Sequence, residues 1–250
     1  MLRIGRNIRD LDCPFQDEID FSYEHNFDII QVWYKQGKID STYELDPINT
    51  LKNSKIKSII HAAFDIDDFE SYEDDLINKL TKLNHQELIL HPMIKTKEIN
   101  KETVKELEEK VLNLLNKLDK LNITVYVENN HKDMQCFYTL TQWKNFFKKA
   151  PKNTEFLIDV VHVLYCDDYD YMKKLVSIKR PKAIHIADTI KGRVGNRHLH
   201  IPIGKGIIDF NKIFNEIIPN YNDLIILEIK NTDKYILESR DKIKNILDKK

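Results

Sequence analysis

The chain has 250 residues, of which 42% are hydrophobic, and this is enough to bury the core of one α/β barrel or of two small domains. Lys and Arg number 39 against 40 Asp and Glu, so the net charge of −1 does not point to a polyanionic partner such as bulk duplex DNA. Three cysteines outside any CxxC pattern, an N-terminus unlike a signal peptide and the lack of an apolar run of about 18 residues together predict a soluble, cytoplasmic protein with reduced thiols and no membrane partner.

Short runs rich in Ile and Val alternate with longer segments of helical periodicity, a pattern typical of βα units and a parallel sheet. We expect eight strands: Leu2–Ile8, Phe27–Trp33, Ile56–Phe64, Glu87–His91, Ile123–Glu128, Phe156–Val160, Ala183–Ala187 and Leu224–Ile229. Eight such units predict an α/β fold, a closed (β/α)8 TIM barrel that occupies residues 1–250 as a single domain.

The helices are most clearly indicated where apolar residues step by three and four. Two such stripes are Phe69, Tyr72, Leu76, Leu80 and Leu83, and Val104, Leu107, Val111, Leu114 and Leu118. The segment between Trp33 and Ile56 is less regular, and we interpret it as a long loop with a short helix near Asp46–Asn53.

Glycines concentrate in one place. Four of the six, Gly192, Gly195, Gly204 and Gly206, follow the seventh predicted strand. Glycine permits positive φ and a close approach of the backbone to a ligand, so this loop is expected to have unusual geometry. The same loop carries four basic or imidazole side chains, Arg193, Arg197, His198 and His200.

Residues able to bind a metal stand near the ends of six predicted strands: His61, His91, Glu128, Asp159, His185 and Glu228. Further candidates, His162, His198 and His200, lie in the loops that follow. The carboxyl ends of barrel strands form the active-site face, and burying an unpaired carboxylate there costs several kcal/mol. A divalent cation would neutralise Glu128 and Glu228, and mixed imidazole and carboxylate ligands favour Zn²⁺, Mn²⁺, Fe²⁺ or Co²⁺ over Ca²⁺.

Simpler interpretations exist for each residue taken alone. One histidine at a strand end is more often a core or capping residue than a ligand. A carboxylate there also fits an ion pair with Lys35 or Lys230, and Asp159 with His162 fits a turn and a helix cap. His25, His85 and His131 lie outside the pattern and are expected at the surface, and the cysteines are expected to serve in packing.

Several short motifs carry a family resemblance over nearly the whole chain. They are IHAAF with His61, LILHP with His91, VYVENN with Glu128, IDVVH with Asp159 and His162, IHIAD with His185 and Asp188, HIPIGKGIIDF with His200, and ILEI with Glu228. In this order and spacing the sequence resembles the xylose isomerase-like barrel superfamily. That superfamily contains sugar and sugar-phosphate isomerases and epimerases, together with the endonuclease IV type of apurinic-site endonuclease.

The resemblance implies two sets of ligands. In the isomerase branch, one metal is held by the residues that match Glu128, Asp159, His185 and Glu228, while the match of His162 and a loop arginine contact substrate. In the endonuclease branch, His61 and His91 share Glu128 with the first metal. A third metal there uses His162, an aspartate and His200, and this sequence has His198 in place of the aspartate.

We therefore expect one to three divalent ions and a metal-dependent enzyme. As a sugar or sugar-phosphate isomerase or epimerase, it would use Glu128 and Glu228 to transfer protons through a metal-stabilised enediolate, while His162 and Arg193 or Arg197 steady the oxyanion. The alternative is an endonuclease IV-like phosphodiesterase with a two- or three-zinc centre that acts on abasic DNA, and a third interpretation is a non-catalytic metal-binding barrel. The residues expected to bind a substrate, with phosphate favoured because arginine binds it bidentately, are Arg6, Arg9, Lys35, Arg193 and Arg197. A homodimer is compatible with the sequence.

Overall fold

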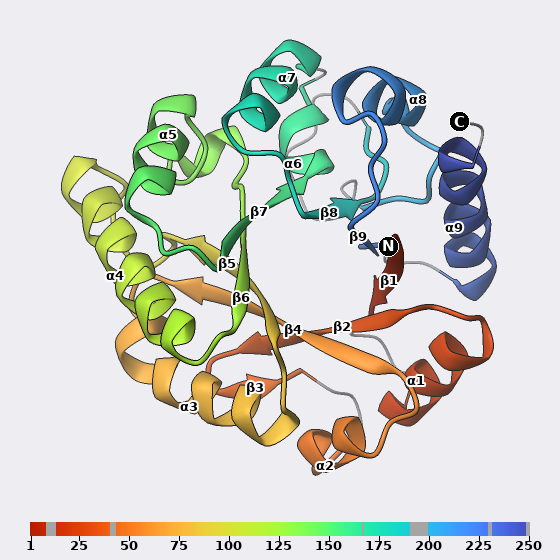
Figure 1. Ribbon diagram of the computed structural model, residues 1–250, viewed down its shortest axis with the longest axis horizontal. Coiled ribbons are helices and arrows are strands. Elements are labelled where there is room, and N and C mark those ends of the chain that lie inside the picture. Colours follow the sequence, from red (N-terminus) through yellow and green to blue (C-terminus); the bar gives the residue numbers. More distant parts are fainter. Residues whose placement is uncertain (9–13, 41–43, 167, 191–199, 230–231, 249–250) are drawn as a thin grey trace.

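The structure is a computed structural model, and it describes residues 1–8, 14–40, 44–166, 168–190, 200–229 and 232–248. Its parallel strands are β1 (Arg3–Asn7), β2 (Ile29–Lys35), β4 (Lys57–Asp65), β5 (Glu87–Met93), β6 (Thr124–Glu128), β7 (Thr154–Asp159), β8 (Ala183–Ile186) and β9 (Leu224–Leu227). β1 pairs in parallel with both β2 and β9, so the sheet closes on itself (Figure 1). The predicted (β/α)8 barrel is confirmed.

The connection after β2 contains a strand that the sequence did not predict. β3 (Lys38–Ile39) folds back antiparallel onto β2 through Gln36 and Gly37, whose φ angles are 47° and 78°. Two consecutive positive φ values are characteristic of a tight two-residue hairpin. The predicted short helix follows as α2 (Pro47–Lys52), which begins where the Asp46 side chain accepts a hydrogen bond from Asn49 N.

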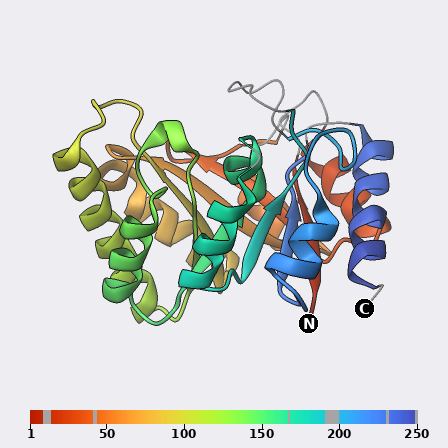
Figure 2. The ribbon, with the colours of Figure 1, turned by 90° about the horizontal axis from the view of Figure 1, so that it is seen from above.

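Helices cover the outside of the barrel (Figures 1 and 2). They are α1 (Phe15–Glu24), α3 (Asp68–Leu83), α4 (Lys101–Lys120), α5 (Leu140–Lys149), α6 (Val160–Leu164), α7 (Tyr169–Ile178), α8 (Phe210–Lys212) and α9 (Asp233–Leu247), with a 3₁₀ turn at Lys132–Met134 and a π-helical turn at Ile213–Ile217. α4 shows why they form: Asn100 caps its first turn, and Leu107, Val111, Leu114 and Leu118 are buried as predicted. Within the described ranges, no helix is long and apolar enough to cross a membrane.

Side chains fill the barrel interior in layers. An apolar cluster separate from the core beneath the helices consists of Ile29, Ile59, Ile89, Tyr126, Leu157, Ala183, Leu224 and Ile226. β1 contributes Gly5 to this layer, where a Cβ atom would lie 2.5 Å from Ile29 Cγ2. At the level of this layer the barrel interior is therefore filled by close-packed side chains.

A ring of polar side chains follows this apolar layer on the side of the carboxyl ends of the strands. Because side chains on a strand alternate between faces, the residue two positions further along points into the barrel as well. On the eight strands these residues are Asn7, Gln31, His61, His91, Glu128, Asp159, His185 and Glu228. The ring contains all six predicted strand-end residues and adds two amides, Asn7 and Gln31.

Candidate metal centre

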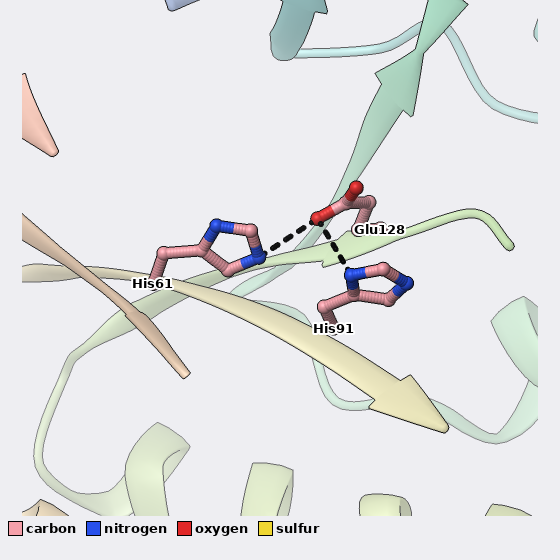
Figure 3. Close-up of side chains that lie close together, drawn as sticks. All are labelled: His61, His91 and Glu128. Carbon is pink, nitrogen blue, oxygen red and sulfur yellow. Dashed lines mark ion pairs between the residues drawn. The ribbon is translucent and has the colours of Figure 1, made fainter. Parts of the chain in front are cut away.

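Two histidines approach one carboxylate on the β4–β6 side of the ring (Figure 3). His61 Nε2 lies 2.9 Å from Glu128 Oε2, and His91 Nδ1 lies 3.5 Å from the same oxygen. The three residues come from the adjacent strands β4, β5 and β6, and the ring centroids of His61 and His91 lie 5.9 Å apart. They form one of four groups in the described chain whose ligand atoms lie within 4.8 Å of one another.

The two glutamates of the ring face a common centre. His185 Nδ1 lies 3.4 Å from Glu128 Oε1 and 3.6 Å from Glu228 Oε1. His61 connects the same pair, because its Nδ1 lies 3.4 Å from Glu228 Oε1. Among the described residues, the histidines and Gln31, rather than Lys35, are therefore the neighbours of these buried carboxylates. Lys230, the other lysine considered for an ion pair, lies outside the described residues.

Asp159 serves two purposes with its two oxygens. Oδ1 accepts hydrogen bonds from Val161 N and His162 N and so caps α6, as the simpler interpretation of the sequence proposed. Oδ2 faces the centre, 3.5 Å from His162 Nε2 and 3.4 Å from His200 Nε2. His200 reaches it from a loop position with φ 64°.

Several buried polar atoms of the cluster make no hydrogen bond within the described chain. They are His61 Nδ1 and Nε2, His185 Nδ1 and Glu128 Oε2. A buried polar group without a partner is costly. A divalent cation between the imidazole nitrogens and carboxylate oxygens would satisfy these atoms together, so the residues present fit such an ion.

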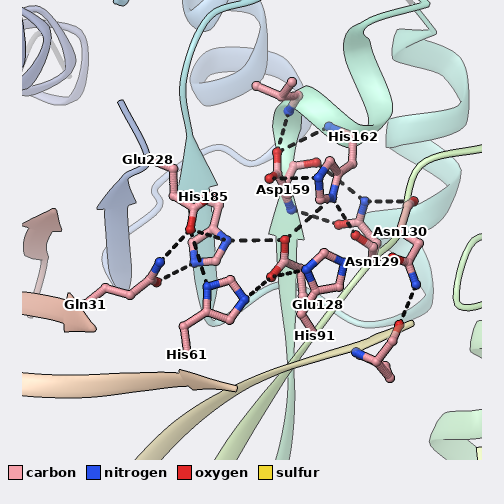
Figure 4. Close-up of polar contacts among 12 residues, drawn as sticks. Gln31, His61, His91, Glu128, Asn129, Asn130, Asp159, His162, His185 and Glu228 are labelled. Atoms are coloured by element: carbon pink, nitrogen blue, oxygen red, sulfur yellow. Dashed lines mark hydrogen bonds and ion pairs between the residues drawn. The ribbon is translucent and has the colours of Figure 1, made fainter. Parts of the chain in front are cut away.

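Outer hydrogen bonds orient two of the histidines for ligation (Figure 4). The Asn130 amide nitrogen donates to Pro92 O and Cys136 O, so its Oδ1 must accept the hydrogen bond from His91 Nε2, at 2.7 Å. His162 Nδ1 donates to the Asn129 carbonyl oxygen at 2.9 Å. In each neutral ring the other nitrogen, which faces the carboxylates, therefore carries the lone pair, as metal ligation requires.

The ionisable side chains of the cluster strongly shift one another's pKa values. Burial opposes protonation of His61, but Glu128 and Glu228 outweigh it and raise the pKa of this ring to about 9. Asp159 and Glu228 likewise overcome burial and raise the pKa of His200 to about 10. Burial alone would raise the pKa of both glutamates, whereas the surrounding histidines hold it well below the usual range. The centre therefore keeps its carboxylates ionised and attracts positive charge.

A cavity of about 370 Å³ opens onto this centre. Its lining includes both glutamates, His91, His162 and His200, together with Asn7, Trp33, Lys35, Lys95, Asn130 and His131. Lys35 also lies 3.6 Å from Asp40 and over the ring of Trp33. Lys35 therefore lines the cavity, and its role in binding substrate stays a prediction.

Other predicted residues lie elsewhere. Arg6 alternates with the inward-facing Gly5 and Asn7, so its side chain points out of the barrel, where it is buried against Glu18 and Ser22 of α1. The prediction that Arg6 binds substrate is therefore wrong. The predictions for Arg9, Arg193, Arg197 and His198 fall outside the described residues.

The three histidines expected at the surface, His25, His85 and His131, are all half-buried. His131 is half-buried and lines the cavity, and its ring centroid is 5.8 Å from that of His162. His85 is half-buried at the opposite end of the barrel, where its Nε2 is 2.9 Å from Ser58 Oγ. Sequence reasoning also missed Gln31, Asn129 and Asn130, although the last two stand in the VYVENN motif, directly after Glu128.

A sequence profile described as "Xylose isomerase-like TIM barrel" matches residues 73–246, well over half of the chain. The chain belongs to this family. No curated protein sequence matches it. Membership of the xylose isomerase-like family agrees with the closed barrel of this chain and with its cluster of side chains at the strand ends.

Solved structures share the fold of this xylose isomerase-like protein at low sequence identity. A D-tagatose 3-epimerase-like protein is 19% identical over 98% of this chain and 97% of its own, with a TM-score of 0.72. D-Psicose 3-epimerase from Clostridium cellulolyticum H10, solved with D-tagatose, is 14% identical over 98% and 99%, with a TM-score of 0.71. IolI protein, solved with a zinc atom, is 14% identical over 99% and 98%, with a TM-score of 0.67. At these identities the similarity establishes the fold.

Proposed function

We propose that this protein is a divalent-metal-dependent isomerase or epimerase of sugars or sugar phosphates. The observation that carries the proposal is the convergence of two buried carboxylates, Glu128 and Glu228, on His185 Nδ1 at the floor of the cavity. The shared fold with D-tagatose 3-epimerase-like and D-psicose 3-epimerase proteins supports it.

Glu128, Asp159, His185 and Glu228 would hold the principal cation, and this donor set suits Zn²⁺, Mn²⁺, Fe²⁺ or Co²⁺. When bound, such a cation polarises a substrate carbonyl and makes the neighbouring C–H bond more acidic. IolI protein, with the same fold, was solved with a zinc atom.

The protein's own groups perform the proton transfer. One of the two glutamates removes the proton next to the carbonyl, and the other returns a proton to the substrate. His162 is held at Nδ1 by Asn129 O and presents Nε2 to the centre. When Nε2 takes up a proton the ring becomes an imidazolium, and Nε2 would then donate a hydrogen bond to the oxygen on which negative charge develops.

The rest of the cavity suits a polar, anionic substrate. Asn7 Oδ1 is buried in the lining and has no hydrogen-bond partner among the described residues, and it would accept from a sugar hydroxyl. Lys35 and Lys95 add positive charge, and the backbone of Lys95 is fixed by a 2.7 Å hydrogen bond to Asp65 Oδ1. These lysines, with Arg9, Arg193 and Arg197 as predicted from the sequence, favour a phosphorylated sugar.

The first test is a panel of ketoses and ketose phosphates in deuterated water, with the bound metal measured by elemental analysis. We expect deuterium to enter next to the carbonyl, and Glu228→Gln to reduce kcat by a factor of about 10² to 10⁴. The matched control is Glu155→Gln, because Glu155 pairs with Lys179 away from the cavity. Full activity and full metal content in Glu228→Gln would refute the assignment.

A second candidate is hydrolysis of phosphodiesters in abasic DNA. The groups His61–His91–Glu128 and Asp159–His162–His200 favour it, because they offer positions for further ions beside the principal one. Two or three tightly bound ions together with nicking of an abasic duplex would support this function. One ion and no nicking would leave the isomerase or epimerase.

A further inference from the structure

Gln31 is a fully buried polar residue with two partners far away in sequence. Its Oε1 lies 2.8 Å from His185 Nε2, and its Nε2 lies 2.5 Å from Glu228 Oε1. The amide therefore bridges the ends of β8 and β9 across the barrel interior (Figure 4).

The orientation of this amide is determined by its charged partner. If the amide were flipped, its oxygen would face the Glu228 carboxylate, and two acceptors would meet at 2.5 Å. The −NH₂ group must therefore face Glu228. This leaves only the acceptor Oε1 for His185, so His185 Nε2 has to carry the proton that it donates.

The position of this proton decides what His185 presents to the centre. In the neutral ring with a proton on Nε2, the lone pair is on Nδ1. This atom faces Glu128 Oε1 and Glu228 Oε1 and has no hydrogen-bond partner in the part of the chain that the structure describes. A lone pair facing two carboxylates is repulsive until a cation lies between them.

We propose that Gln31 is a positioning residue that locks His185 in the Nε2-protonated form and holds the Glu228 carboxylate beside it, so that both present lone pairs to the same cation. The proposal rests on the metal-dependent function proposed above. In many metal sites the second ring nitrogen of a bound histidine donates a hydrogen bond to a carboxylate or a carbonyl group. Here the neutral amide of Gln31, on β2, would accept that hydrogen bond.

The test compares Gln31→Met with the wild type, since methionine fills a similar volume and makes neither hydrogen bond. Affinity for Co²⁺ is measured by competition with a chromophoric chelator, and the visible Co²⁺ spectrum reports ligand geometry. We expect binding to weaken about 10- to 100-fold and the spectrum to change.

Tyr34→Phe is the matched control, because Tyr34 is a buried residue of the same strand and its hydroxyl donates to Asp75 Oδ2 outside the barrel interior. It loses one buried hydrogen bond without touching the centre, so its Co²⁺ affinity and spectrum should equal those of the wild type. Equal affinity and spectrum in Gln31→Met would overturn the role of Gln31.

A second measurement does not depend on the variant folding. Long-range ¹⁵N–¹H spectra of histidine-labelled, metal-free wild type, with the His185 signals assigned from His185→Gln, report which ring nitrogen carries the proton. A proton on Nε2 supports the proposal, and a neutral ring protonated on Nδ1 overturns it. Wild type that binds no divalent cation would contradict the proposed function instead, so the two failures are distinguishable.

Discussion

Gly5 is required by packing inside the barrel. A Cβ atom at this position would lie 2.5 Å from Ile29 Cγ2 and 2.6 Å from Ile29 O. We expect Gly5→Ala to lower the free energy of unfolding by about 2 kcal/mol, as overpacked cores do, measured by urea denaturation. Ser71→Ala, on the exposed side of α3, is the control and should stay within about 0.5 kcal/mol. Equal stability of Gly5→Ala and wild type would contradict this prediction, because it would mean that β1 shifts to make room for the methyl group at no cost in free energy.

His85 predicts a pH dependence of stability that is independent of the metal centre. Burial lowers its pKa to about 4, although Glu87 opposes the shift. The unfolded chain takes up a proton on this residue below about pH 6.5, whereas the folded protein does not. Stability attributable to His85 is therefore complete above pH 6.5 and decreases as the pH falls towards 4, by about 3 kcal/mol in total.

The measurement is urea denaturation of wild type and His85→Gln at pH 7 and pH 4.5 in the presence of a chelator. Glutamine does not titrate, so the difference in unfolding free energy between the two proteins should shift in favour of the variant at the lower pH. A difference that does not depend on pH would contradict the assignment.

At the residue scale, the predictions from sequence succeeded where strand periodicity alone decides orientation. Glu128 ends β6 and Glu228 directly follows β9, and both must point inwards two residues after Tyr126 and Ile226. The same rule places Arg6 outside, between Gly5 and Asn7, and a strict application of it would have excluded Arg6 from the substrate site.

At the element scale, Asp188 organises the loop that brings His200 to the centre. Its fully buried Oδ1 accepts from Thr189 N and Ile208 N, and its Oδ2 accepts from Gly204 N and Gly206 N, at 2.8 to 3.0 Å. The backbone of Asp188 also pairs with Ile201, the residue after His200. Part of the expected unusual loop geometry is present in the φ of 80° at Gly204.

This arrangement predicts the result of Asp188→Asn. The new −NH₂ group would face backbone N–H donors that now have an acceptor, and the unfolding free energy should fall by about 3 kcal/mol. Co²⁺ affinity should fall with it, because His200 loses its support. Asp209→Asn is the control, since Asp209 caps α8 in the same loop and asparagine caps equally well. Unchanged stability in Asp188→Asn would contradict the role of Asp188.

The eight strands could be predicted because most of them are short runs rich in Ile, Val or Leu between polar turns, as in Ile56–Phe64. β3 could not, because two residues contain no periodicity. Gln31 was missed for a different reason: its partners His185 and Glu228 are 154 and 197 residues away, and only the closure of the barrel brings them together.

At the scale of the whole molecule, the candidate metal centre joins elements that are distant along the chain. Its candidate ligands come from β4, β5, β6, β7 and β8, from α6, from the residue after β9 and from the loop at His200. No pair of neighbouring strands contains the complete site. Cation binding should therefore be coupled to formation of the entire barrel, because the unfolded chain does not hold these ligands together.

The coupling predicts the size of the thermal shift. A cation present at 100 times its Kd adds about 2.7 kcal/mol to the free energy of unfolding. For a chain of this length, each kcal/mol raises Tm by about 2–4 °C, so we expect a rise of roughly 5–10 °C between chelator and excess Zn²⁺ or Mn²⁺ in a scanning calorimeter. The shift should nearly vanish in the double variant Glu128→Gln, Glu228→Gln and persist in Glu155→Gln, whose side chain pairs with Lys179. A full shift in the double variant would mean that the stabilising ion binds elsewhere, because removing both carboxylates leaves the histidines without the negative charge that holds a cation in this ring.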